Sequence, residues 1–341
     1  MKNPAAWIFG SAGRDFCALN LGGLAAFAFV WLAPLDAAWA GPVLFFCMAT
    51  IDTGHMYSTV WRTHFRIEEL KSTKLYWGAP LTVFLVALVW ITARVPYLLT
   101  AVLYATIYHH MRQYYGVVRW YEKLNRRFSG ASKFFIHALF ALPLLAAHFN
   151  PRGISQIFNT GDLLLYPHPG LYAATTTIYL TVLAAWLAYE ITTWTRGHRE
   201  PNRALAIGLP MLFTGVGCYF GRSTPQILLP LVCTHGVAYF SLMALSLERL
   251  EPKRYPSVGI PFAGIVAFAA VAGYSALYFE ERFMDAGYST EALTFNEATV
   301  MALLLVPTVC HYLFDAWIWT GRHREARIVF ATRFGTATRK Q

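Results

Sequence analysis

Residues 225–248 read PQILLPLVCTHGVAYFSLMALSLE, and this stretch decides the fold class. It is long and apolar enough to cross a bilayer, because a helical span needs about 20 mostly apolar residues. Before Glu248 at its end, the only acidic or basic side chain in it is His235. The stretch therefore predicts a membrane-spanning helix that carries a histidine inside the hydrocarbon.

The composition of the whole chain supports the same class. Of the 341 residues, 56% are hydrophobic and only 13% are charged, whereas an ordinary globular domain has about 25% charged residues. A soluble protein with so few charged residues could not cover its water-exposed surface with charged side chains. The five cysteines show no CxxC spacing, so neither a disulfide scaffold nor a zinc knuckle is indicated. The fold class that follows is an all-α, polytopic transmembrane bundle.

Other apolar segments of similar length bring the predicted number of spans to ten. They are 17–34, 41–62, 76–95, 97–120, 132–150, 170–193, 204–220, 225–248, 259–278 and 298–320. No cleavable signal peptide is indicated, because the first 16 residues lack a continuous apolar core. Without a repeat, a low-complexity segment or a soluble domain, residues 1–341 are predicted to form a single integral-membrane domain. The longest stretches outside the spans are 148–169, a candidate re-entrant or lid segment, and the acidic 279–297.

The distribution of basic residues predicts the orientation of the bundle. With the amino terminus in the cytoplasm and ten spans, 23 of the 28 lysines and arginines lie in cytoplasmic segments, as the positive-inside rule requires. Both termini are therefore predicted to be cytoplasmic. The basic residues that give the chain its formal net charge of +10 then face anionic lipid headgroups on the cytoplasmic side. The predicted partners are membrane lipids, not nucleic acid, and the predicted location is the bacterial inner membrane.

Several polar side chains lie inside the predicted spans, where an ionisable group is costly unless it faces the bundle or a cavity. The candidate site residues are Asp52, His55, His109, His110, Arg112, Gln113, His235, His311 and Asp315. With a rise of about 1.5 Å per residue, the five imidazoles lie about 15–20 Å from the outer ends of four parallel spans. Histidines that only pack have no reason to share a level, so this depth indicates a metal centre.

Spacing along each span suggests roles around such a centre. Asp52 and His55 are three residues apart, and His311 and Asp315 are four apart, so each carboxylate can share a helix face with its imidazole. A carboxylate so placed can orient a metal-bound histidine or bind the metal itself.

The fourth span offers further candidates for the same centre. The side chains of His109 and His110 point about 100° apart on a helix, so the two are not expected to bind one ion equally. Gln113 lies one turn after His109 and can orient it. Arg112 is expected to tune the site or to hold the polar head of a substrate.

A purely structural interpretation also exists for each group. A lone histidine in a span, such as His235, is more often a hydrogen-bonded packing residue than a ligand. The aspartates can pair with an intramembrane cation such as Arg62 or Arg112. Three other histidines, His64, His137 and His148, lie near span ends and are expected to be interfacial.

The types of ligand atom limit which metal the predicted centre would bind. Imidazole with carboxylate suits iron, zinc, copper or manganese, and the absence of cysteine thiolates at the site argues against an iron–sulfur cluster. No HExxH, GxSxG or P-loop motif is present. Iron with open positions, acting with O2 on a hydrophobic molecule, fits best because both reactants partition into the bilayer.

Polytopic helices with many histidines resemble the integral-membrane non-haem iron oxygenases, and isolated histidines inside spans, here His55, His110, His235 and His311, look most like those of the Brp/Blh-type carotene dioxygenases. That group includes lipid desaturases, alkane hydroxylases and the Brp/Blh-type carotene dioxygenases. The resemblance is one of construction and not of an alignable length. It implies one or two iron ions, O2, a lipid or isoprenoid substrate, and an electron-donor protein as a partner.

Two other function classes remain open at this stage. One is a haem- or quinone-binding electron carrier in which paired histidines, such as His109 and His235, are axial ligands. The other is a proton-coupled transporter in which the histidines and aspartates relay protons.

Overall fold

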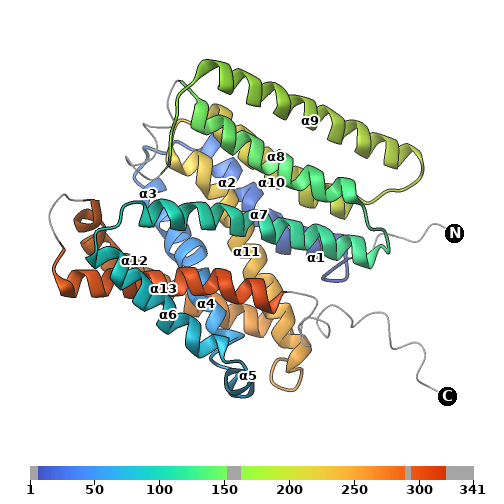
Figure 1. Cartoon of the computed structure of the whole chain (residues 1–341). Coiled ribbons are helices and arrows are strands. Elements are labelled where there is room, and N and C mark those ends of the chain that lie inside the picture. Colours follow the sequence, from blue (N-terminus) through green and yellow to red (C-terminus); the bar gives the residue numbers. More distant parts are fainter. Residues whose placement is uncertain (1–6, 152–162, 289–292, 320–341) are drawn as a thin grey trace, which may run out of the picture. The chain divides into compact units, whose positions relative to one another are not determined.

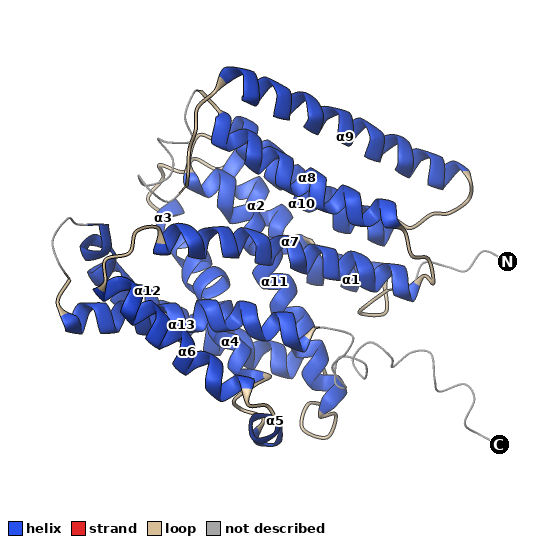
Figure 2. Ribbon diagram, viewed as in Figure 1, coloured by secondary structure: helices blue, strands red, loops and turns tan. Residues whose placement is uncertain are grey.

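The structure is a computed structural model that describes residues 7–151, 163–288 and 293–319, with backbone alone for residues 280–288. Every regular element in these ranges is a helix, and none of them contains a strand (Figures 1 and 2). The predicted all-α class is thus confirmed. The predicted position of both termini concerns residues 1–6 and 320–341, which lie outside the described residues, and so do residues 152–162 of the candidate lid segment.

The chain divides into two compact units, each made of two stretches. Unit 1 comprises Met1–Leu35 and Leu99–Ala238, and unit 2 comprises Asp36–Leu98 and Tyr239–Gln341. The division falls inside one continuous helix, α11 (Thr224–Leu250). The first part of α11 therefore belongs to unit 1 and the second part to unit 2.

Unit 1 is built from six further helices. They are α1 (Ala12–Leu19), α2 (Leu21–Leu32), α7 (Leu98–Leu124), α8 (Gly130–Phe149), α9 (Pro169–Thr195) and α10 (Pro201–Phe220). Both α9 and α10 begin at a proline, where the missing N–H costs no helical hydrogen bond. Helix α8 packs against α9 and α10 (Figure 1).

A buried ion-pair network joins these three helices. Arg203, only 2% exposed, donates from Nη2 to Glu190 Oε2 and from Nε to Glu200 Oε2, both at 2.9 Å. Its Nη1 donates to Ser132 Oγ on α8 at 3.1 Å. A buried guanidinium that lost these partners would be an uncompensated charge, which costs about 3–5 kcal/mol. Arg203 thus holds α8, α9 and α10 together.

Unit 2 has shorter elements in its first stretch and long helices after them. They are α3 (Ala40–Phe46), the π-helix η1 (Cys47–Thr53), α4 (Gly54–Ser58), the 3₁₀-helix η2 (Thr59–Trp61), α5 (Ile67–Ser72), α6 (Leu75–Thr92), α12 (Gly259–Tyr288) and α13 (Phe295–Ile318). Helix α6 packs against α13, and α12 packs against η1 and α4 (Figure 1).

The predicted second span, 41–62, is thus divided into α3, η1, α4 and η2. Its backbone lies directly against that of α12, since a Cβ added at Gly54 would overlap the Ala269 carbonyl and one at Gly273 would overlap the Ala49 carbonyl. Short π-helical insertions are frequent at functional sites. This one ends at Thr53, two residues before His55.

Seven helices among the described residues are long and apolar enough to cross a membrane, which indicates an integral membrane protein. They are α6 and α8 to α13, and the pair α1 and α2, bent by 53°, would make an eighth if it is one span. The predicted fourth span, 97–120, forms the long helix α7, but it does not meet the same apolar criterion. The predicted count of ten and the predicted sidedness therefore stay predictions.

Candidate metal centre

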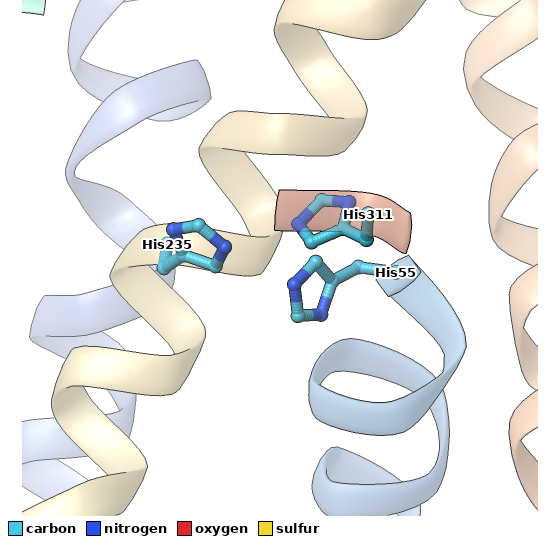
Figure 3. Close-up of side chains that lie close together, drawn as sticks. All are labelled: His55, His235 and His311. Atoms are coloured by element: carbon cyan, nitrogen blue, oxygen red, sulfur yellow. The ribbon is translucent and has the colours of Figure 1, made fainter. Parts of the chain in front are cut away.

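Unit 2 brings together His55 of α4 with His311 and Asp315 of α13. All three are buried, with exposed fractions of 2%, 0% and 7%. The centroids of the two imidazole rings lie 4.8 Å apart with the ring planes at 87° (Figure 3). One helical turn further along α13, Asp315 Oδ2 lies 3.7 Å from His311 Nε2. His311 thus has an imidazole from a separate element and a carboxylate of its own helix as buried neighbours.

The hydrogen bond made by His55 determines which of its nitrogens can bind a cation. Nδ1 lies 2.7 Å from the carbonyl oxygen of Ile51, in the π-helix. Because a carbonyl oxygen only accepts, Nδ1 carries the proton, and Nε2 of the neutral ring carries the lone pair. Metal-binding histidines typically make such a bond from their other ring nitrogen.

The ring of His311 is held by two hydroxyl groups in series. Its Nδ1 lies 2.7 Å from Thr59 Oγ1, and Thr59 Oγ1 lies 2.9 Å from the Tyr239 hydroxyl. Sequence reasoning did not select Thr59 or Tyr239. One signal could have found them, since Thr59 follows His55 by four residues and Tyr239 follows His235 by four, so each shares a helix face with a candidate.

A buried cation also belongs to this part of unit 2. Arg62 is 1% exposed; its Nη1 donates to Ser246 Oγ at 2.6 Å, and its guanidinium lies 5.6 Å from the centroid of the Trp319 ring. The remaining candidate of this unit, Asp52, is half-buried in η1.

Unit 1 holds the other three imidazoles, His109 and His110 on α7 and His235 on α11. They are 8%, 6% and 0% exposed, and His235 is the third residue labelled in Figure 3. The rings of His109 and His235 meet at 78° with their centroids 4.9 Å apart. Those of His110 and His235 are stacked, 4.1 Å apart and 24° from parallel. Lone pairs lie in the ring plane, so two stacked rings do not direct theirs at one ion.

Two predicted site residues of α7 have different surroundings from those expected. Gln113 was expected to orient His109, but its Nε2 donates to the backbone carbonyl of His235 at 3.3 Å and so links α7 to α11. Arg112 is exposed, and its guanidinium lies 5.3 Å from the centroid of the Tyr115 ring.

The three histidines expected near span ends have local partners. Half-buried His137 bonds through Nδ1 to the Lys133 carbonyl at 2.7 Å. His148 Nε2 lies 2.7 Å from the Tyr104 hydroxyl. His64 lies between η2 and α5, and its Nε2 donates to the Tyr76 carbonyl at 3.1 Å. Burial lowers the pKa of the His64 imidazole, and the hydrogen bond to Tyr76 opposes this effect in part.

In comparisons with known proteins, no family model, no curated protein and no solved structure matches the chain. The arguments about function therefore depend on the geometry within each unit.

Proposed function

We propose that this chain is a membrane-embedded, iron-dependent oxygenase that acts with O2 on a lipid or isoprenoid substrate in the bacterial inner membrane. The observation that carries the proposal is that His311 has two buried neighbours in unit 2, the imidazole of His55 and the carboxylate of Asp315. Two histidines and one carboxylate are the ligand set of non-haem Fe(II) oxygenases, and this set leaves coordination positions open for reactants.

The spacing of His311 and Asp315 leaves room for a metal ion. Two neighbouring ligands that each lie about 2.1 Å from an ion are roughly 3.4 Å apart around a tetrahedral ion and roughly 3.0 Å apart when they are facial ligands at right angles. The 3.7 Å between His311 Nε2 and Asp315 Oδ2 is too long for a hydrogen bond, and the two atoms would move closer together on binding an ion. The rings of His55 and His311 meet edge to face (Figure 3), and the hydrogen bond to Ile51 leaves the lone pair of His55 on Nε2.

Each residue of the group would contribute separately to the chemistry. Bound iron would supply the activation of O2. His55 and His311 would hold the ion as neutral ligands, and Asp315 would offset part of its charge. Burial of all three keeps bulk water away, which strengthens electrostatic interactions and limits side reactions. A hydrophobic substrate and O2 would enter from the bilayer, and an electron-donor protein would supply reducing equivalents.

The imidazoles of unit 1 bear on two further questions, whether a second iron ion is bound and whether the cofactor is a haem. His109 and His235 meet nearly edge to face and are the pair in this unit suited to a second iron ion. The same pair fits a haem poorly. Two axial imidazoles on one haem iron place their ring centroids roughly 6 Å apart with the porphyrin between them, whereas these lie 4.9 Å apart. The geometry thus favours non-haem iron over the haem alternative.

Metal analysis of the purified protein tests the proposal. We expect about one or two iron ions per chain, and a loss of iron when His55→Ala and His311→Ala are combined. His137→Ala is the matched control, because that imidazole is half-buried on α8 and bonds to the Lys133 carbonyl of its own helix. An absence of transition metal from the wild type, iron retained in the double variant, or a Soret band would each refute the proposal.

A proton-coupled transporter is the second candidate. The 53° bend between α1 and α2 favours it, because discontinuous helices are typical of transporters. Uptake into liposomes that depends on a pH gradient, by a protein free of iron, would select this alternative.

A further inference from the structure

We propose that a pocket in unit 1 is a binding site for the hydroxyl end of a neutral, long-chain alcohol. The pocket lies among α1, α7, α10 and α11, and its lining includes the polar residues Asn20, Gln113 and Thr234 beside apolar side chains such as Val117 and Pro210. It is not fully enclosed, and the space within it is about 20 Å³, enough for one water-sized group. The inference concerns unit 1 alone and does not depend on the proposed metal centre.

Asn20 lies at the break between α1 and α2, where the chain bends by 53°. The residue is only 8% exposed. Its backbone N–H bonds to the Phe16 carbonyl, but its side-chain amide does not cap α2 and has no hydrogen-bond partner among the described residues. A buried amide without a partner costs free energy. Because Asn20 lines the pocket, a ligand there would supply the missing hydrogen bonds.

Gln113 of α7 contributes an acceptor to the same pocket. Its Nε2 donates to the backbone carbonyl of His235 at 3.3 Å. Since a carbonyl only accepts, this bond determines which end of the amide is the oxygen. That oxygen, Oε1, is buried and has no partner in the part of the chain that the structure describes. A ligand that donates a hydrogen bond to Oε1 would remove the cost of leaving it unpaired.

The hydroxyl groups of the lining already use their protons within unit 1. Tyr114 donates to the Leu231 carbonyl at 3.1 Å, and Thr234 donates to the carbonyl one turn before it in α11 at 2.6 Å. Tyr121 donates to Asp15 Oδ2 at 2.7 Å. These oxygens therefore have only lone pairs to offer to a ligand. None of the described residues that line the pocket carries a charge.

A neutral hydroxyl group matches this lining better than a charged headgroup does. It donates one hydrogen bond, which Gln113 Oε1 can accept, and it accepts one, which the Asn20 amide can donate. An ammonium or a carboxylate group would be buried without an opposite charge, which costs more than burial of a neutral group. The space for one water-sized group fits the hydroxyl, and the apolar side chains fit the methylene groups that follow it. The ligand is therefore an alcohol with a long apolar chain.

A close contact beside the pocket holds its wall in place. Gly23 of α2 lies directly against α11, since a Cβ added there would overlap Thr234 Oγ1 and contact the ring of Phe213. This contact fixes the start of α2, three residues after Asn20, against the helix that carries Thr234. The polar groups of the pocket are thus already in position before a ligand binds.

Photolabelling of the purified full chain tests the class of ligand. The probe is hexadecanol with a diazirine next to the carbon that bears the hydroxyl, and mass spectrometry locates the labelled peptides. We expect label in α1, α7 or α11 and competition by unlabelled hexadecanol. Methyl hexadecyl ether, which cannot donate a hydrogen bond, and hexadecanoate, which is charged, should compete much more weakly. No label in these helices, or equal competition by the alcohol and the ether, would overturn the inference and leave a site for water only.

Variants of the two amides test the contacts themselves. Asn20→Leu and Gln113→Met keep the approximate size of the side chain and remove its hydrogen-bonding groups. In each, the hexadecanol concentration that halves the labelling should rise about 3- to 10-fold, the usual effect of one hydrogen bond. Thr177→Val is the matched control, because its exposed hydroxyl donates to the Ala173 carbonyl of α9. Asn20→Leu decides the question if Gln113→Met does not fold.

Thermal unfolding separates binding from a structural role of Asn20. Without ligand, Asn20→Leu should keep the melting temperature of the wild type or raise it, because the amide that it removes has no partner among the described residues. A lower melting temperature together with unchanged competition by hexadecanol would contradict the inference.

Iron analysis of the same samples separates this inference from the proposed function. Asn20→Leu should contain as much iron as the wild type. An iron-containing wild type that does not distinguish hexadecanol from its ether would overturn the inference about the pocket alone. An iron-free wild type with the expected labelling would overturn the proposed function alone.

Discussion

His311 and Asp315 lie one turn apart on α13, with Nε2 and Oδ2 separated by 3.7 Å inside a buried part of unit 2. This separation is too long for a hydrogen bond and suits two ligands of one ion. A proposed function for this chain must therefore account for this pair.

Replacement of the carboxylate is the first test of that pair. Asp315→Asn keeps the size of the side chain but removes its charge, so we expect iron affinity to fall by at least about tenfold. Metal content after dialysis against a graded series of chelator concentrations measures the change. Asp315→Glu keeps the charge and should retain more iron than Asp315→Asn; equal losses in the two variants would argue against a carboxylate ligand.

A second prediction concerns the close approach of α12 to the segment that carries His55. Gly273→Ala would place a methyl group in the Ala49 carbonyl, and the backbone shift needed to relieve it should cost about 1–3 kcal/mol. Because η1 and α4 would move, iron should also be lost. Gly78→Ala on α6 is the control, since a Cβ there meets nothing within 4 Å. Thermal unfolding in detergent and iron content are the measurements, and a Gly273→Ala protein equal to Gly78→Ala in both would contradict the prediction.

A third prediction tests the ion-pair network of unit 1. Arg203→Gln leaves Glu190 and Glu200 without their main partner, so we expect a loss of about 3–5 kcal/mol in the free energy of unfolding. Arg199→Gln replaces an exposed arginine in the loop just before α10 and should change stability by less than about 0.5 kcal/mol. Denaturant unfolding in detergent compares the two. Similar stabilities would show that the network contributes little.

The fourth prediction concerns pH. Burial holds the pKa of His64 below its ordinary value of about 6.5 in the folded protein, so the unfolded chain binds a proton first as the pH falls. The stability that comes from a neutral His64 is therefore fully present above the unfolded pKa and decreases as the pH drops below about 6.5.

His64→Gln should remove this part of the pH dependence. Melting temperatures recorded from about pH 7.5 to 5.5 should fall less steeply for His64→Gln than for the wild type. His137→Gln, at a half-buried position on α8, should behave as the wild type does. A wild-type slope in His64→Gln would mean that other groups account for the acid sensitivity.

Much of the architecture could be predicted from composition and hydropathy. The apolar segments that became α6 and α8 to α13 are long enough to span a bilayer, and a helix is the form in which such a segment satisfies its own backbone hydrogen bonds. Residues 41–62 were predicted as one span because hydropathy averages over a window and does not detect the π-helix at Cys47–Thr53. Conversely, the polar residues around His109 interrupt the apolar pattern of the fourth predicted span, yet α7 forms one long helix there.

By itself the sequence determined that imidazoles lie within apolar helices and that Asp315 shares a helix face with His311, because both follow from distances along one chain segment. Only the tertiary structure decided that His55 meets His311 within unit 2 and that His235 meets His109 and His110 within unit 1. Neighbours across helices depend on how each helix is rotated about its axis and which helix packs beside it. The π-helix before His55 and the glycine contacts of α12 set that rotation through side-chain and backbone packing, which no spacing within a single helix encodes.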